Sequence, residues 1–245
     1  MRFRVMTYNI HKCIGGLDRL YRPQRIVDAI AHCRPDLVCL QEVDDGVPRS
    51  SHDRQVHLLG DALELPHRAF QRNVSLTRGH YGNAILSRFP LSDVHHLELT
   101  VPPKKRRRGL AVHCRIRCEQ QTRTLLLFNV HLGLAGFERS IQLRRILSSE
   151  LLDRTQRKTA VIVAGDFNDV WGNLGRNLLE PAEFKPAGTH IRTFPAALPL
   201  RPLDRIYYRG DIQLEHVFGS HTDNVRQASD HLPLVAEFVF PTVGE

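Results

Sequence analysis

The 245-residue chain is long enough to bury a hydrophobic core, and its composition is that of an ordinary globular protein. Hydrophobic residues make up 42% of the sequence and charged residues 24%, which excludes a mainly disordered or collagen-like chain. No apolar run approaches the roughly 20 residues that span a bilayer, and the N-terminus lacks the apolar block of a signal peptide. We therefore expect a cytoplasmic protein that forms a single domain over residues 1–245 and is not an integral membrane protein.

Positive charge is in excess. The chain has 34 Lys and Arg residues against 26 Asp and Glu, which gives a formal net charge of +8 at pH 7. A basic balance favours polyanionic partners such as nucleic acid, an anionic membrane surface or phosphorylated substrates. A basic surface that serves only solubility is the alternative. The charge narrows the class of partner without identifying it.

The hydrophobic pattern predicts strands and helices along the whole chain. A first strand at residues 3–10 precedes a helix that begins near Pro23, because the first helical turn tolerates proline. Helices are also expected at residues 52–63 and 138–152, whereas residues 171–202 are rich in Pro, Gly and Asn and are expected to be irregular. Further strands are expected at residues 36–40, 83–87, 110–116, 124–130, 161–164, 205–208, 212–218 and 234–240.

Many strands with few helices between them favour mixed sheets that are covered by helices. A sandwich of two sheets with helices on the outside buries the apolar face of every element. Periodicity alone does not distinguish this sandwich from a doubly wound sheet, so both remain open at this point.

Polar side chains recur where apolar strands end. Each one alone has an ordinary explanation, as a turn residue, a helix cap or a satisfied hydrogen bond. Their repetition predicts that several strands deliver carboxylates, amides and imidazoles to one rim of the fold. These residues are Asn9, Glu42, Asn129, His131, Asp166, Asn168, Asp204, Asp230 and His231.

Oxygen donors dominate this set. Glu42, Asp166 and Asp230 provide carboxylates, and Asn9 and Asn168 provide amide oxygens. Such donors suit Mg²⁺ or Mn²⁺. Zinc would require closely spaced His or Cys, and the five cysteines of the chain have no such spacing. Mg²⁺ is therefore the expected cofactor, with Mn²⁺ as the alternative.

A set of short motifs runs through the chain from residue 7 to residue 231: Thr7-Tyr8-Asn9-Ile10, Gln41-Glu42-Val43, Gly82-Asn83-Ala84-Ile85-Leu86-Ser87, Asn129-Val130-His131-Leu132, Gly165-Asp166-Phe167-Asn168, Leu203-Asp204-Arg205-Ile206 and Ser229-Asp230-His231. In these motifs and their order the sequence resembles the endonuclease/exonuclease/phosphatase superfamily, as a bacterial member. That superfamily includes deoxyribonuclease I and the neutral sphingomyelinases. The resemblance implies an α+β fold, a four-layer αββα sandwich of the deoxyribonuclease I type with its site at one end.

The resemblance also implies a division of roles at the site. Glu42 matches the principal metal ligand of the family, and Asn9 and Asp230 match residues that hold the metal and its waters. Asp166 and Asn168 match the residues that position the attacking water and the phosphoryl oxygens.

Two histidines are expected to act in catalysis. Asp204 matches the residue that orients His231, and an Asp–His hydrogen bond favours the protonated imidazole next to a phosphate. His131 matches a second histidine that contacts phosphate or protonates the leaving group in deoxyribonuclease I-like and sphingomyelinase-like members. Deoxyribonucleases pair it with a carboxylate just before the strand at residues 83–87, but residues 77–81 contain none. A structural histidine at a strand end is the alternative for His131.

Arg108, Asn83, Asn129 and Tyr81 are expected to bind the substrate phosphate. Arg108 ends the run Lys104-Lys105-Arg106-Arg107-Arg108 and stands where family members often carry a phosphate-binding arginine. A run of cations is usually a solvated loop. Beside a phosphoryl-transfer site, it favours contact with a polyanion, and several phosphate contacts would make affinity fall steeply with salt.

Together these features predict a Mg²⁺-dependent phosphodiesterase that acts as a monomer on nucleic acid, with DNA preferred. An endonuclease is favoured over an exonuclease. The alternative substrates are a phospholipid or sphingomyelin head group and a small phosphorylated metabolite. The remaining alternative is a polyanion-binding protein without catalysis, which the complete set of site residues disfavours.

Overall fold

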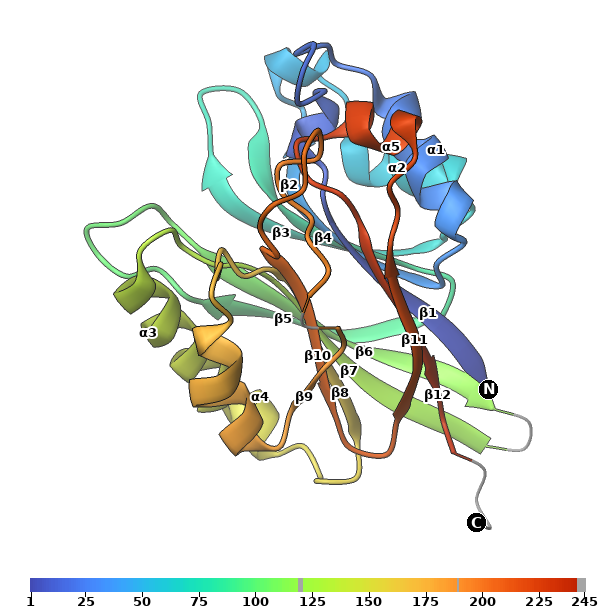
Figure 1. Ribbon diagram of the computed structural model, residues 1–245, viewed down its shortest axis with the longest axis vertical. Coiled ribbons are helices and arrows are strands. Elements are labelled where there is room, and N and C mark those ends of the chain that lie inside the picture. The colour runs from blue at the N-terminus through green and yellow to red at the C-terminus, as the bar shows by residue number, and fades with distance from the viewer. Residues whose placement is uncertain (119–120, 189, 242–245) are drawn as a thin grey trace.

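The computed structural model describes residues 1–118, 121–188 and 190–241, and two mixed β-sheets of six strands form its centre (Figure 1). The first sheet contains, in spatial order, β11 (Gln213–Gly219), β12 (Leu234–Val239), β1 (Arg2–Asn9), β2 (Leu37–Asp45), β4 (His80–Ser87) and β3 (His67–Ser75). The second contains β5 (Leu91–Glu98), β6 (Arg108–Cys118), β7 (Gln121–His131), β8 (Ala160–Asp166), β10 (Asp204–Arg209) and β9 (Lys185–Pro186). In each sheet the two central strands are parallel, β1 with β2 and β7 with β8.

The two sheets pack face to face through one apolar cluster. Val5 and Leu37 from the first sheet belong to the same cluster as Leu125 and Ile162 from the second. Alternate residues of these strands point outward toward the helices, so both faces of the central strands are covered. All seven residues of β8 are buried for this reason, which explains its continuous apolar run.

Helices cover the outer face of each sheet and complete four layers (Figure 1). The first sheet is covered by α1 (Pro23–Cys33), α2 (Gln55–Ala62) and α5 (Asp223–Ala228). The second is covered by α3 (Gly136–Leu147), α4 (Glu150–Asp153) and a π-helical turn at Gly175–Leu179. Short 3₁₀ turns occupy His11–Cys13, Pro48–Ser50 and Glu180–Ala182. The predicted αββα sandwich is thereby confirmed. No helix among the described residues is long and apolar enough to cross a membrane.

The structure adds elements that the sequence pattern did not reveal. Strands β3 and β5 were not predicted because each forms an edge of its sheet and carries polar or exposed residues along much of its length. Helix α5 is too short to show a helical period. The helix predicted at residues 138–152 is wrong as a single element. It divides at Ser149, whose side chain accepts a hydrogen bond from the Leu152 amide and begins α4.

Two buried amides join the sheets at one end of the sandwich. The Asn129 Nδ2 of β7 donates to the carbonyl oxygens of Leu40, at 2.9 Å, and Ala84, at 2.8 Å, both in the opposite sheet. Gln41 Nε2 donates to Asn129 Oδ1 at 2.7 Å. All three hydrogen bonds cross between layers in a fully buried position, so they fix the spacing of the strand ends that carry the polar rim.

We expect Asn129→Ala to lower the free energy of unfolding by about 2–4 kcal/mol, because it leaves two carbonyl oxygens and the Gln41 amide without their buried partner. Urea unfolding measures this loss. Asn173→Ala, at an exposed asparagine, is the control and should change stability by less than about 0.5 kcal/mol. Equal stabilities for the two variants would contradict the structural role of Asn129.

Candidate active site

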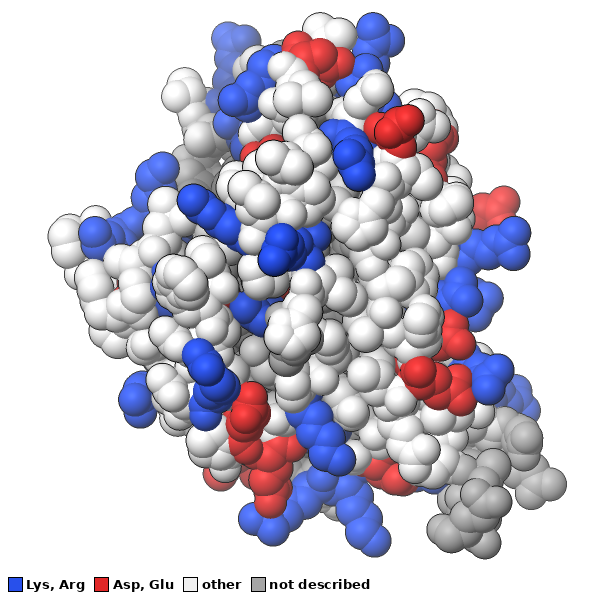
Figure 2. All heavy atoms as spheres, viewed as in Figure 1, with Lys and Arg blue, Asp and Glu red and all other residues white. Residues whose placement is uncertain are grey.

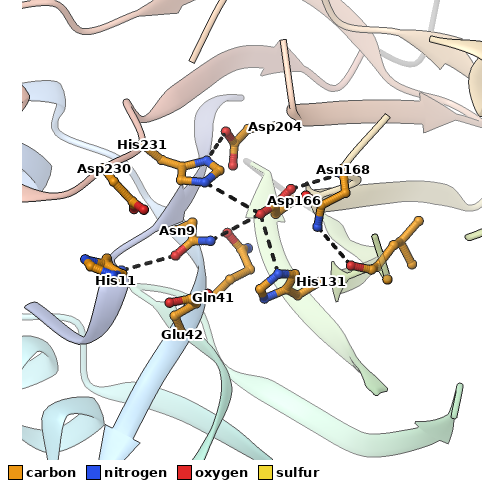
Figure 3. A network of polar contacts seen from close by, with 12 residues as sticks. Asn9, His11, Gln41, Glu42, His131, Asp166, Asn168, Asp204, Asp230 and His231 are labelled. Atoms are coloured by element: carbon orange, nitrogen blue, oxygen red, sulfur yellow. Dashed lines mark hydrogen bonds and ion pairs between the residues drawn. The ribbon is translucent and has the colours of Figure 1, made fainter. Parts of the chain in front are cut away.

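The polar rim lies where the carboxyl ends of both pairs of parallel strands meet (Figure 3). Asn9 ends β1, Glu42 lies in β2, His131 ends β7 and Asp166 ends β8. Asp204 begins the antiparallel strand β10 directly opposite Asp166, so it reaches the same edge. A cavity of about 830 Å³ opens here. The topology therefore brings together side chains from both sheets, as the strand-end pattern predicts.

Local backbone irregularities aim two of these carboxylates. Glu42 has a φ of +59° at a β-bulge between β2 and β4, which breaks the regular alternation of the strand. Gly165, directly before Asp166, has a φ of +151°, and a Cβ at that position would lie 1.9 Å from the Val130 carbonyl oxygen. Only glycine fits there, and it lets β8 approach β7 closely just before Asp166.

Asp166 is the hub of the network (Figure 3). Its Oδ2 accepts a hydrogen bond from Asn9 Nδ2 at 3.1 Å and lies 3.6 Å from His131 Nε2 and 3.8 Å from His231 Nε2. Its Oδ1 accepts from the Asn168 backbone amide at 3.0 Å. Burial raises the pKa of the Asp166 carboxyl, and the two histidines partly offset that rise. The result is a buried carboxylate whose affinity for a proton is higher than that of an ordinary aspartate.

His231 is held as an imidazolium. Its Nδ1 donates to Asp204 Oδ2 at 2.8 Å. Burial opposes the charge, but Asp204 and Asp166 outweigh it and raise the pKa of His231 to about 10. The hydrogen bond to Asp204 holds the imidazole ring in one orientation, and His231 is positively charged at neutral pH.

His131 has the opposite character. Burial, together with the charge of Arg107, lowers the pKa of His131 to about 4, although Asp166 and Glu42 act in the other direction. Its Nδ1 has no hydrogen-bond partner in the described part of the chain. Among the described residues, no carboxylate accepts a hydrogen bond from His131 Nδ1, as a carboxylate does in the second carboxylate–histidine pair of deoxyribonucleases. At neutral pH His131 is uncharged.

Glu42, Asn9 and Asp230 fit a hard cation. Burial would raise the pKa of Glu42, but His131 and Lys12 outweigh it and lower the pKa to about 2, so the carboxylate is ionised at neutral pH. It lines the cavity with Asn9 and Asp230, and Lys12 Nζ forms an ion pair with its Oε2. A carboxylate that draws a cation of the chain itself into a partly buried contact is a suitable ligand for Mg²⁺.

A second group of potential metal ligands is better explained by hydrogen bonding. Asp166, Asp204 and His231 are buried, with candidate ligand atoms within 4.8 Å of one another. Metal ligation requires a neutral imidazole, whereas the pKa of His231 is about 10 and its Nδ1 is bonded to Asp204. The hydrogen bond to Asp204 and the raised pKa of His231 therefore favour a charged hydrogen-bond network over a metal centre for this group.

Cations surround the cavity. The walls carry Lys12, Arg49, Lys105, Arg106, Arg107 and Arg201. Figure 2 shows several Lys and Arg side chains across the middle and upper left of the face in view, with few Asp or Glu side chains among them. The cavity therefore combines an acidic floor with basic walls.

The structure places Arg108 and Arg107 differently from the expectation. Arg108 Nε donates to Glu98 Oε2 at 3.1 Å, outside the residues that line the cavity. Its neighbour Arg107 lines the cavity, and its Nε is buried without a hydrogen-bond partner among the described residues. The geometry thus favours Arg107 over Arg108 for contact with an anion.

The other three residues expected to bind phosphate are also distributed unequally. Tyr81 lines the cavity, with Lys12 Nζ 5.6 Å and Arg49 Cζ 5.5 Å from its ring centroid. Asn83 is fully buried and donates to the Arg108 carbonyl oxygen at 3.3 Å. Asn129 is used between the sheets, so the structure brings only Tyr81 of these three to the cavity wall.

Sequence reasoning missed several side chains of the cavity. Lys12 lies three residues after Asn9, and its closeness to the motif that contains Asn9 was the one indication in the sequence that it lines the cavity. Phe194 lies in the stretch expected to be irregular, and its ring centroid is 4.8 Å from that of His231. Gln41 belongs to the motif Gln41-Glu42-Val43, but only the structure reveals its hydrogen bond to Asn129 between the sheets.

Comparison with known proteins supports the fold and the motifs. The model of the endonuclease/exonuclease/phosphatase family matches residues 6–231. The chain is 32% identical to the protein YbhP of Escherichia coli K12 over 250 residues, covering 96% of this chain and 95% of YbhP.

Solved structures share the architecture at lower identity. An endonuclease/exonuclease/phosphatase protein from Beutenbergia cavernae superposes with a TM-score of 0.81 at 22% identity, covering 98% of this chain and 72% of that one. ANGEL2, described as a 2′,3′-cyclic phosphatase and solved with adenosine-2′,3′-vanadate, gives a TM-score of 0.74 at 18% identity. That match covers 97% of this chain and 95% of ANGEL2.

We expect Asp204→Asn to move the titration of His231 from about pH 10 toward or below the ordinary histidine value of about 6.5. Histidine ¹⁵N NMR of the metal-free protein measures it. Because the pKa of His231 is raised in the folded state, its interaction with Asp204 stabilises the fold. This stabilisation is complete below about pH 6.5 and disappears as pH rises toward 10. The stability difference between wild type and variant should narrow over that interval. A wild-type His231 that titrates near pH 7 would contradict this assignment.

Proposed function

Because the chain belongs to the endonuclease/exonuclease/phosphatase family, whose members hydrolyse phosphoester bonds, we propose that it is a Mg²⁺-dependent phosphodiesterase that cleaves DNA internally. The observation that carries this proposal is the arrangement around Asp166. An ionised Glu42 and a charged His231 lie near a buried carboxylate, at the floor of a cavity with basic walls.

Glu42 is the proposed principal ligand of the cation, with Asn9 and Asp230 beside it. When bound, the cation neutralises charge on the phosphoryl oxygens and stabilises the leaving oxygen. Hydrogen bonds from neighbouring residues hold Asn9 and Asp230 in place for this role. Asn9 Oδ1 accepts from the His11 amide at 3.1 Å, and Ser229 Oγ, which donates to the Asn9 carbonyl oxygen, lies 3.4 Å from Asp230 Oδ1.

Asp166 is the proposed base that orients the attacking water and takes its proton. The raised pKa of its carboxyl brings its basicity closer to neutral pH, which makes proton transfer more efficient. Asn9 and the Asn168 amide fix the two carboxylate oxygens, so the carboxylate is held in one orientation. Asn168 Nδ2 donates to the Leu132 carbonyl oxygen at 3.0 Å, which holds this side chain at the cavity wall for a phosphoryl oxygen.

The two histidines are proposed to stabilise the phosphoryl group in different ways. His231 presents a positive charge at Nε2, which favours negative charge that develops on a phosphoryl oxygen. His131 is neutral and supplies a hydrogen bond, or the leaving-group proton once the phosphate raises its proton affinity. The two histidines differ in charge because Asp204 raises the pKa of His231, whereas burial and Arg107 lower the pKa of His131.

DNA is favoured by the number of cations in the cavity wall. Lys12, Arg49, Lys105, Arg106, Arg107 and Arg201 all line it. Phosphate contacts with such residues release counterions from the nucleic acid, so binding should weaken steeply as salt increases.

A small phosphoester or a lipid head group is the second candidate. Leu76, Leu134 and Phe194 line the same cavity, and Leu134 is 77% exposed. Apolar groups at the mouth suit a substrate with an apolar part beside its phosphate. Such a substrate needs few phosphate contacts, so its cleavage should depend weakly on salt.

We expect the protein to nick supercoiled plasmid in Mg²⁺, with cleavage abolished by EDTA and in Glu42→Ala. Asp166→Ala and His231→Ala should each lower the rate by roughly 10²–10⁴ while the protein remains folded. Gel assays of plasmid nicking measure these rates. Repeating the assays at increasing salt tests the expected fall in DNA binding. An intact plasmid combined with hydrolysis of a small phosphoester would replace DNA by the second candidate, and near-wild-type cleavage by either variant would refute the assigned roles.

We expect Arg107→Ala to raise KM for DNA by roughly tenfold, because one charge-assisted phosphate contact is worth about 1.4 kcal/mol or more. Arg108→Ala is the matched control, since this arginine pairs with Glu98 outside the cavity, and its KM should stay near the wild-type value. Steady-state kinetics on an oligonucleotide duplex measures both. A larger effect from Arg108→Ala would restore the assignment made from sequence.

A further inference from the structure

The turn after β1 contains three consecutive residues in the left-handed region. The φ angles of His11, Lys12 and Cys13 are +44°, +63° and +60°. Each such conformation is costly for a residue with a Cβ, and runs of them are rare because left-handed residues normally occur singly. A strained backbone of this kind persists only where surrounding contacts determine it, and it is common at functional sites.

Hydrogen bonds from several elements hold this turn in place. The His11 amide donates to Asn9 Oδ1 at 3.1 Å, and the Arg22 amide donates to the Cys13 carbonyl oxygen at 2.9 Å. Gln55, at the start of α2, donates through Nε2 to the Lys12 carbonyl oxygen at 2.7 Å. The conformation of Lys12 is therefore fixed by neighbours on both sides and by a helix distant in sequence.

The turn brings the Lys12 side chain into the cavity. Its ammonium forms an ion pair with Glu42 Oε2 and lies 5.6 Å from the Tyr81 ring centroid. The side chains of Lys12 and Glu42 are only 17% and 18% exposed, so the pair is largely shielded from water. A buried carboxylate without a partner would be destabilised, and Lys12 removes that cost before any cation arrives.

We propose that the Lys12 ammonium competes with the divalent cation for Glu42 and thereby weakens metal binding. This inference rests on the proposed function, which assigns Glu42 as the principal ligand. The oxygen that accepts the ammonium is also a candidate ligand atom, and two cations at one oxygen repel each other strongly where water is scarce. Lys12 must withdraw from Glu42 when the metal binds.

Metal binding without substrate tests the competition directly. Isothermal titration with Mn²⁺, repeated with Mg²⁺, is carried out on wild type, Lys12→Met and Lys12→Gln. Both variants remove the charge, and methionine retains most of the aliphatic stem. We expect the dissociation constant to fall by about tenfold in each, equivalent to about 1.4 kcal/mol.

Two further variants separate local competition from the general charge of the cavity. Lys105→Met removes one positive charge from the same cavity wall, and it should change the dissociation constant by less than about twofold because Debye screening weakens exposed charges at a distance. Lys12→Arg keeps the charge and should retain weak, wild-type-like binding.

The outcomes distinguish this inference from the proposed function. If wild type binds metal and both neutral Lys12 variants bind it equally well, Lys12 does not compete and the inference is wrong. The same conclusion follows if Lys105→Met tightens binding as much as Lys12→Met. If neither wild type nor any variant binds metal, the metal-dependent function itself fails, and the inference fails with it. Thermal unfolding of each metal-free variant verifies that it is folded.

Discussion

A buried carboxylate needs partners, and the site is organised around meeting that need for Asp166. Its partners come from both layers, because Asn9 belongs to the first sheet and His131 to the second. The two sheets must therefore keep a fixed separation at this end of the sandwich. The buried amide of Asn129, bonded across the layers to Leu40 and Ala84, maintains it. The geometry of the candidate site and the packing of the sheets are consequently one constraint, since a shift between the sheets would separate Asp166 from Asn9.

The two histidines show how environment gives the same side chain different charge states. Both are buried within 4 Å of Asp166, yet the pKa of His231 is about 10 and that of His131 is about 4. The difference arises from their remaining neighbours, because Asp204 contacts His231 whereas Arg107 acts on His131. Near neutral pH, neither changes its charge in the metal-free protein. The metal-free site thus presents one charged and one neutral imidazole beside the same carboxylate.

Sequence could identify the rim because strand ends and their motifs are local features. It could not decide which strand-end residues face the cavity. Asn129 and His131 are two positions apart in β7, but only His131 lines the cavity, while Asn129 turns between the sheets. Arg107 and Arg108 are adjacent, and their side chains diverge at the start of β6. Lys12 reaches Glu42 only through a left-handed turn that no periodicity encodes. The missing information was the direction of side chains, which depends on register and turn geometry.

The charges of the cavity also bear on the order in which a divalent cation and a phosphate would bind. Its floor carries Glu42, Asp166 and Asp230, whereas the walls carry Arg107 and other cations. A phosphate attracted by the walls meets repulsion from the carboxylates as it approaches the floor, unless a cation stands between them. Lys12 is the chain's own cation at Glu42, but it provides one charge where a divalent ion provides two. Under the proposed function, a phosphate would therefore be accommodated at the floor most favourably once a divalent cation replaced Lys12 at Glu42. The basic walls would bind an extended polyanion before that exchange, so in the proposed reaction the recognition of the substrate and the commitment to cleavage would be separate steps.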